Sequence, residues 1–281
     1  MADAPPRIFE RRAYAARRAR AARRNGDRFL ALEAAAGLGE RLAAINRKFA
    51  HALDIGSRGP AFSILKPAAQ HWTTISLAPE ATVIADEESL PFAAESFDLV
   101  TSVLSLHAVN DLPGTLLQIR RALKPDGLFL AALFAGETLS ELRHSFAAAE
   151  SEVSGGISPR VAPFADIRDL GGLLQRAGFA LPVADIERTT VRYKEINRLF
   201  ADIRNLGETN VLAERKKSGL RPAVAGAALA QYVANHGEPD GRVRATFDIA
   251  YLTGWAPHES QQKPLTPGTA RVSLADALKK V

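Results

Sequence analysis

Short apolar runs separated by turns and helical stretches fill the chain between residues 51 and 135, and this alternation limits the fold more than any other feature. The runs that have the length of strands are 51–56, 72–77, 82–86, 97–103 and 128–134. They are apolar on both faces, which is typical of a parallel sheet covered by helices on each side. Between the last two runs, Leu116, Ile119 and Leu123 recur at helical spacing. We therefore expect a doubly wound α/β fold.

The second half of the sequence predicts further helices and an antiparallel end to the sheet. We expect helices over 138–152 and 164–177, a strand over 183–193, and a last strand over 246–255. Between these two strands the pattern predicts helices over 196–206, 208–217 and 221–236. A helical insertion at about 195–240 would lie over the carboxyl ends of the strands, where a lid or a substrate-binding surface belongs. The expected organisation is a helical arm, 1–46, and one domain, 47–281.

The amino-terminal segment carries the basic character of the chain. Eight arginines between residues 7 and 24 are opposed there only by Glu10; together they contribute +7 to the net charge of +5, so the rest of the chain carries −2. An alanine- and arginine-rich helix with a solvated face is the simplest interpretation, because both residues favour helices. Contact with acidic protein, RNA or membrane headgroups, and a mitochondrial transit peptide, are the alternatives. A second helix, capped by Asp27, is expected to end at about Asn46.

Composition excludes several kinds of site. The chain has no cysteine, which excludes disulfides, thiolate metal sites and a cysteine nucleophile. Its six histidines are scattered without the spacing of a metal-binding motif, so we expect no metal site. No stretch approaches the roughly 20 apolar residues of a membrane span, although peripheral contact with a membrane stays open. The arm lacks interleaved aromatic residues, so we expect no nucleic-acid partner.

Four motifs follow one another at positions where strands of such a sheet begin or end. Leu53-Asp-Ile-Gly-Ser-Arg-Gly turns out of the first strand, and glycine there lets backbone amides approach a ligand. Asp86 ends the third strand, where a carboxylate can accept a hydrogen bond from an adenine amino group. Leu104-Ser-Leu-His leaves the fourth strand, and Lys124-Pro-Asp-Gly introduces the fifth. In order and spacing, these motifs resemble the class I S-adenosylmethionine-dependent methyltransferases, whose fold is Rossmann-like.

Longer segments narrow the resemblance. They are Ala85-Asp-Glu-Glu-Ser-Leu-Pro-Phe, Leu104-Ser-Leu-His-Ala-Val-Asn-Asp-Leu-Pro, Leu123-Lys-Pro-Asp-Gly-Leu-Phe, Gly136-Glu-Thr-Leu-Ser-Glu-Leu-Arg, Gly155-Gly-Ile-Ser-Pro-Arg-Val-Ala-Pro-Phe, Gly207-Glu-Thr-Asn and Gly254-Trp-Ala-Pro-His-Glu-Ser-Gln. Over nearly the whole chain they look like the family of the methyltransferase-like assembly factor 5 of respiratory complex I. The arm looks like that of bacterial members.

That resemblance implies S-adenosylmethionine as the cofactor and a protein substrate, with a complex I subunit as the expected partner. In the eukaryotic branch, the family is associated with arginine hydroxylation rather than methylation. For a bacterial chain the implied location is the cytoplasm, at the inner membrane surface; for a eukaryotic one it is the mitochondrial matrix.

The motif positions give a set of candidate site residues. We expect His107, just past the fourth strand, to act as a general base or a substrate contact. Structural roles stay open as alternatives: a tight strand-to-helix connection for the glycine turn, a turn cap for Asp86 and a histidine at the sheet edge. The expected cofactor contacts are Asp54, Gly56, Gly59, Asp86, Glu87 and Ser105.

Two departures from the methyltransferase pattern bear on cofactor binding. Gly59 is shifted by one position from the usual spacing, and the following Pro60 has no N–H to donate. Ser76 stands where an acid for the ribose hydroxyls is expected, and the connection from Ser76 to Asp86 is too short for a crossover helix. Three hypotheses therefore remain: a methyltransferase, a protein hydroxylase on the same fold, and a non-catalytic assembly chaperone.

Overall fold

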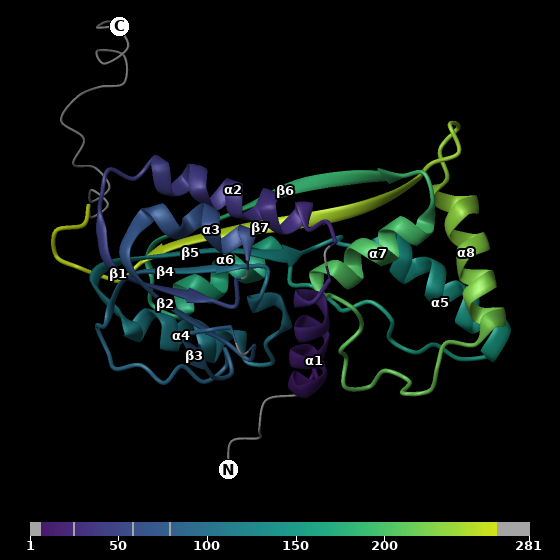
Figure 1. Cartoon of the computed structure of the whole chain (residues 1–281), viewed down its shortest axis with the longest axis horizontal. Helices are drawn as coiled ribbons and strands as arrows, with labels where there is room; N and C mark the ends of the chain where they lie inside the picture. Colours follow the sequence, from purple (N-terminus) through teal and green to yellow (C-terminus); the bar gives the residue numbers. More distant parts are fainter. Residues whose placement is uncertain (1–6, 25, 58, 79, 263–281) are drawn as a thin grey trace, which may run out of the picture.

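The computed structural model describes residues 7–24, 26–57, 59–78 and 80–262, and the end of the expected domain, 263–281, lies outside them. Its centre is a seven-stranded sheet in the order β3-β2-β1-β4-β5-β7-β6 (Figure 1). The strands from β3 to β5 run parallel, and β7 is antiparallel to both of its neighbours. The strands are β1 (Phe49–Ile55), β2 (Ala69–Ser76), β3 (Val83–Ile84), β4 (Phe97–Val103), β5 (Leu123–Ala135), β6 (Ala180–Tyr193) and β7 (Val243–Trp255).

Helices cover both faces of this sheet. Helices α2 (Phe29–Ala43) and α3 (Pro60–Leu65) pack on one face through a core that includes Leu30, Leu38 and Leu65. Helices α4 (Leu112–Ala122) and α6 (Ile167–Arg176) pack on the other face. The central strands are therefore buried on both sides, and all residues of β5 from Gly127 to Ala135 are buried. The doubly wound α/β fold predicted from the sequence is confirmed.

The last two strands carry the chain beyond the sheet. In Figure 1, β6 and β7 run as a long ribbon from the sheet toward a group of helices, α5 (Ser140–Ser154), α7 (Ile196–Leu206) and α8 (Pro222–His236). Helix α1 (Arg11–Ala22) stands between the sheet and this group, and it contacts α7. The helical insertion before the last strand therefore exists, and α1 lies at its junction with the sheet. No helix in the described part of the chain is long and apolar enough to cross a bilayer.

Three expectations about local structure are corrected. Residues 208–217 form no helix; instead Phe9 and Leu212 make an antiparallel bridge, with the Glu10 amide donating to the Val211 carbonyl at 2.8 Å. This pairing uses backbone groups that a helix would need for itself. Helix α2 begins at Phe29 after Arg28 and has no side-chain cap, so Asp27 does not cap it. The third strand, expected over 82–86, is limited to β3, and residues 82, 85 and 86 lie outside it.

The short connection after β2 behaves as expected. The described residues between β2 and β3 contain no helix, and β3 pairs directly beside β2 in parallel. The described residues of this connection therefore place no helix over the β2–β3 edge of the sheet.

Candidate functional site

The glycine turn after β1 requires glycine at its first position. Gly56 has φ +74°, and a Cβ there would lie 2.1 Å from the Ser105 Oγ. Gly59 also has positive φ, and Pro60 follows it as the first residue of α3, where a missing N–H costs no hydrogen bond. Pro60 is thus compatible with the helix, but it removes one donor from the face that a ligand would meet.

Asp54 lies beneath this turn and supports it. Its carboxylate is fully buried, accepts a hydrogen bond from the Thr101 hydroxyl at 2.8 Å and accepts another from the Ser57 amide at 3.0 Å. Burial raises the pKa of Asp54 to about 6, against the lowering effect of these hydrogen bonds. The geometry explains why a carboxylate stands here without involving any ligand.

The end of β2 offers no carboxylate. The Ser76 Oγ accepts a hydrogen bond from the Ala78 amide at 2.9 Å and so closes the turn after the strand. Glu80, the nearest acid in the sequence, is exposed. A ligand at this edge would therefore meet a hydroxyl, one of whose lone pairs is taken by Ala78, where the methyltransferase pattern predicts an acid.

Helix α1 places a guanidinium against the acidic turn after β3. The Arg11 Nη2 donates to Asp86 Oδ1 at 2.8 Å and also pairs with Glu87, which is 1% exposed. The Arg11 Nη1 donates to the Ala108 carbonyl at 2.7 Å. Because the single guanidinium of Arg11 pairs with both carboxylates, it compensates one of their two negative charges and holds the two side chains in one arrangement.

One helical face of α1 continues this contact to the glycine turn. Arg18 Nη2 donates to the Gly56 carbonyl at 2.7 Å, and its Nη1 donates to the Leu104 carbonyl at 2.8 Å. Tyr14 lies between the two arginines: its hydroxyl is 3.2 Å from the Ser105 Oγ and accepts a hydrogen bond from Arg18. Burial raises the pKa of Tyr14 to about 12, so this hydroxyl stays neutral.

Glu208 joins this face of α1 to the end of β4. Its Oε1 lies 3.4 Å from Arg18 Nη1, and its Oε2 lies 2.9 Å from His107 Nε2. The His107 side chain is 4% exposed, and its Nδ1 is buried with no hydrogen-bond partner among the described residues. Glu208 thus holds one ring nitrogen and leaves the other available.

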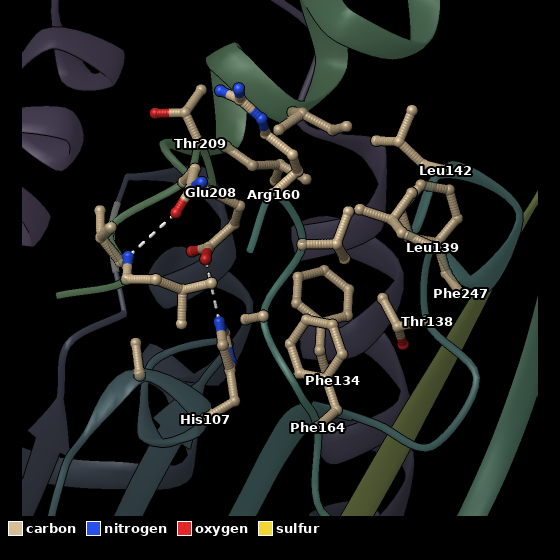
Figure 2. Close-up of a pocket in the computed structure, with 18 of the residues that line it drawn as sticks. His107, Phe134, Thr138, Leu139, Leu142, Arg160, Phe164, Glu208, Thr209 and Phe247 are labelled. Atoms are coloured by element: carbon tan, nitrogen blue, oxygen red, sulfur yellow. Dashed lines mark hydrogen bonds and ion pairs between the residues drawn. The ribbon is translucent and has the colours of Figure 1, made fainter. Parts of the chain in front are cut away.

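His107 and Glu208 form one wall of a cavity of about 230 Å³. Figure 2 shows the two side chains pointing toward each other, with the rings of Phe134 and Phe164 beside them. The His107 ring centroid lies 5.1 Å from that of Phe134 and 5.9 Å from that of Phe164. Further lining residues are Thr138, Leu139, Leu142, Phe146, Arg160, Thr209 and Phe247.

The cavity combines apolar walls with few polar groups. Arg160 is paired with the buried Glu150, its Nε donating to Oε1 at 2.9 Å, so its charge is compensated outside the cavity. Thr209 Oγ1 is buried without a partner among the described residues. Drug-sized ligands occupy pockets of roughly 300–1,000 Å³. A cavity of about 230 Å³ fits a single side chain better than a whole nucleoside cofactor.

Comparison with known proteins places the chain in a family. A profile described as a methyltransferase domain matches residues 14–182, more than half of the chain. Arginine-hydroxylase NDUFAF5 of Mus musculus is 41% identical over 265 residues, which cover 89% of this chain and 77% of the mouse protein. The chain belongs to the methyltransferase-domain family, in the branch of NDUFAF5. The resemblance read from the sequence motifs is confirmed.

Two further matches of this family member show a shorter overlap and a more distant likeness. NDUFAF5 of Danio rerio is 47% identical over 201 residues, and the chain covers 62% of that protein, slightly less than two thirds. Among solved structures, the YcgJ protein of Bacillus subtilis superposes with a TM-score of 0.54 at 14% identity, over 79% of this chain and 99% of YcgJ. At that identity the likeness concerns the fold alone.

The structure brings most of the candidate residues of this methyltransferase-domain chain to one place. Gly56, Asp86, Glu87 and Ser105 meet at the carboxyl ends of β1 and β4, and His107 lies beside them at the cavity. Asp54 is beneath the turn, and Gly59 is one step further along it.

Sequence reasoning missed Arg11, Tyr14, Arg18 and Glu208. Tyr14 lies three residues after Arg11 and four residues before Arg18. This spacing could have placed the three side chains on one face of a helix. Glu208 belongs to Gly207-Glu-Thr-Asn, one of the segments that carry the family resemblance, but nothing in that segment indicates a function for it.

Proposed function

We propose that this chain modifies the side chain of a protein arginine in the His107–Glu208 cavity, as part of complex I assembly, with S-adenosylmethionine held at the carboxyl ends of β1 and β4. The observation that carries this proposal is the pairing of a carboxylate with aromatic rings in a cavity the size of one side chain. The proposed substrate follows the names of the relatives, which are called arginine-hydroxylases. The proposed location is the cytoplasm, at the membrane surface where complex I is assembled.

The lining of the cavity suits an arginine side chain. A guanidinium is a planar cation that pairs with carboxylates and stacks on aromatic faces, so Glu208 and the ring of Phe164 complement it. The apolar walls formed by Leu139 and Leu142 complement the methylene stem. A guanidinium is already accommodated at Glu208, because Arg18 of the same chain approaches it to 3.4 Å.

His107 has a role that follows from its two ring nitrogens. If Nε2 carries the proton and donates to Glu208, Nδ1 has a lone pair that can accept an N–H of the substrate. For methyl transfer, a guanidinium must lose a proton before one of its nitrogens can attack the methyl group; hydroxylation would instead require an oxidant such as molecular oxygen to supply the oxygen atom. His107 is therefore the proposed group that receives this proton, and Glu208 stabilises the imidazolium that forms.

The cofactor site fits S-adenosylmethionine in part. The turn at Gly56 has no side chain, so its backbone lies directly against Ser105, and Asp86 and Glu87 carry carboxylates that can accept hydrogen bonds from an amino group. When bound, S-adenosylmethionine supplies an electrophilic methyl group. The missing acid at Ser76 would cost about 1.5–3 kcal/mol, or one to two orders of magnitude in affinity. We therefore expect weak cofactor binding, with Asp54, Gly59 and Ser105 as supporting residues.

Two kinds of product remain, and separate observations favour them. The names of the relatives favour hydroxylation, whereas the methyltransferase-domain profile favours methyl transfer. Mass spectrometry of complex I subunits from cells with and without this protein distinguishes an added oxygen atom from an added methylene group. A subunit arginine with either addition, absent in the deletion strain, is the expected result. Unmodified arginines together with failed assembly would support a non-catalytic chaperone instead.

A matched pair of variants tests the role of the cavity. Glu208→Gln keeps the shape of the side chain but removes its charge, and we expect at least a hundredfold loss of modification, because hydrogen bonds to buried charged groups are worth about 1.5–3 kcal/mol and the proton acceptor also loses its partner. Glu214→Gln removes an exposed charge from the same segment and should retain wild-type modification. Equal modification by both variants would contradict the assignment of the cavity.

A further inference from the structure

The acceptors proposed for the cofactor are already occupied by donors of α1. Arg11 donates to Asp86 and pairs with Glu87, and Tyr14 is 3.2 Å from the Ser105 Oγ. Arg18 occupies the backbone carbonyls of the glycine turn and of the β4 end. A cationic ligand that carries an amino group and an adenine would need these same acceptors.

We propose that α1 is an intramolecular competitor of the cofactor, so that S-adenosylmethionine enters only when the face formed by Arg11, Tyr14 and Arg18 leaves the carboxyl ends of β1 and β4. The identity of the ligand rests on the proposed function. The competition itself rests on the hydrogen bonds of α1, whose guanidinium groups present N–H donors as the amino groups of such a ligand would.

The way α1 is held suits a segment that can leave. Its buried side chains are Tyr14, Arg18 and Ala21, so few apolar groups are buried by the helix itself. The attachment depends instead on charge-assisted hydrogen bonds of Arg11 and Arg18, whose acceptors a ligand with matching N–H donors can satisfy in place of the helix. Segments with few buried apolar contacts open at low free-energy cost. At the amino-terminal end, the bridge between Phe9 and Leu212 can act as a hinge that keeps the helix nearby.

Departure of α1 would also change the substrate cavity. Arg18 approaches Glu208, which in turn holds His107, so one side chain of α1 reaches both sites. Once Arg18 has left, the guanidinium of a substrate can replace its contact with Glu208 Oε1. The two sites are therefore coupled: the conformation that admits the cofactor also removes an intramolecular competitor for the proposed substrate carboxylate.

The opposite arrangement, in which α1 closes over a bound cofactor and holds it, predicts effects of the opposite sign. When the competent conformation is a small fraction of the molecules, the apparent dissociation constant is the intrinsic one divided by that fraction. Weakening a competitor therefore tightens binding, whereas weakening a cover loosens it.

Calorimetric titration of the full chain with S-adenosylmethionine distinguishes these arrangements. We expect Arg11→Gln to bind about tenfold tighter than wild type, the equivalent of losing one hydrogen bond to a charged group. The matched control is Arg12→Gln, an exposed residue of the same helix with the same loss of charge, which should bind within about twofold of wild type. Tyr14→Phe keeps the ring but loses the hydroxyl, and should tighten binding by a few-fold.

Hydrogen exchange supplies a second measurement that does not depend on the stability of a variant. In the wild-type chain, the amides of residues 11–22 should exchange faster when S-adenosylmethionine is present. Equal affinities for Arg11→Gln and Arg12→Gln would overturn the competition and leave the proposed function intact, as would slower exchange of α1 with ligand. No binding by wild type or by any variant would overturn the competition together with the proposed cofactor.

Discussion

Two neighbouring regions differ in whether their polar groups have hydrogen-bond partners. They are the carboxyl ends of β1 and β4 and the cavity beside them, and His107 and Glu208 lie between the two. At the strand ends, Arg11 and Arg18 donate to the carboxylates and carbonyls. In the cavity, His107 Nδ1 and Thr209 Oγ1 are buried without a partner among the described residues. An unpaired buried polar atom costs free energy unless a ligand satisfies it. The first region is thus closed by the chain itself, whereas the second holds a ring nitrogen and a hydroxyl with which a bound molecule can pair.

The largest expected effect comes from substituting Gly56 in the turn after β1, where α1 covers the strand ends. Gly56→Ala would place a Cβ 2.1 Å from the Ser105 Oγ and 2.5 Å from the Ser105 Cβ, in a backbone conformation that only glycine adopts readily. We expect the free energy of unfolding to fall by about 3 kcal/mol, measured by urea denaturation. Gly156→Ala is the control, since its added Cβ would meet nothing within 4 Å and its φ is not positive. Similar losses for both variants would contradict this account of the turn.

A smaller effect concerns the buried carboxylate under the same turn. The pKa of Asp54 in the folded chain is raised to about 6 by burial, above its ordinary value of 3.8. A carboxyl with a raised folded-state pKa stabilises the fold below its unfolded pKa, and this contribution is lost as the pH rises through about 6. Wild type should therefore lose about 2 kcal/mol relative to Asp54→Asn between about pH 4 and about pH 7.

Denaturation of wild type and Asp54→Asn across that pH range measures the difference directly. The asparagine can still accept from the Ser57 amide and donate to the Thr101 hydroxyl, so the variant keeps two hydrogen bonds of the wild type. A constant difference between the two proteins at all pH values would show that Asp54 titrates alike in the folded and unfolded chain.

The two regions also differ in how far the sequence predicts them. The sheet, the glycine turn and the missing helix after β2 follow from local patterns: apolar runs of strand length, a glycine after a strand, and a connection too short to cross over. The turn residues Gly56 and Asp86 could be placed because they lie at the ends of such runs.

The cavity and the contact of α1 depend on partners that are distant in the sequence. Residues 208–217 have the composition of a helix, but their backbone pairs with residues 8–10, about 200 positions earlier. The buried residues of α1 are one arginine, one tyrosine and one alanine, so they produce no strong apolar periodicity for a pattern to detect. Glu208 acquires its role through His107 and Arg18, which come from two other elements.

The smallest expected effect tests whether the His107–Glu208 cavity binds a cation. Phe164 is half-buried, and its ring makes an edge contact with His107 at 5.9 Å. Phe164→Leu keeps an apolar side chain but removes the aromatic face, so a guanidinium substrate should lose a cation–π contact worth about 1 kcal/mol. We expect KM for the protein substrate to rise about fivefold, with kcat and Tm nearly unchanged, because the contact is made in ground state and transition state alike. Phe92→Leu, which removes an edge contact with Phe97 in the core on the other face of the sheet, is the matched control and should leave KM unchanged. A rise in KM for both variants, or for neither, would contradict the proposal that the ring of Phe164 binds the guanidinium of the substrate.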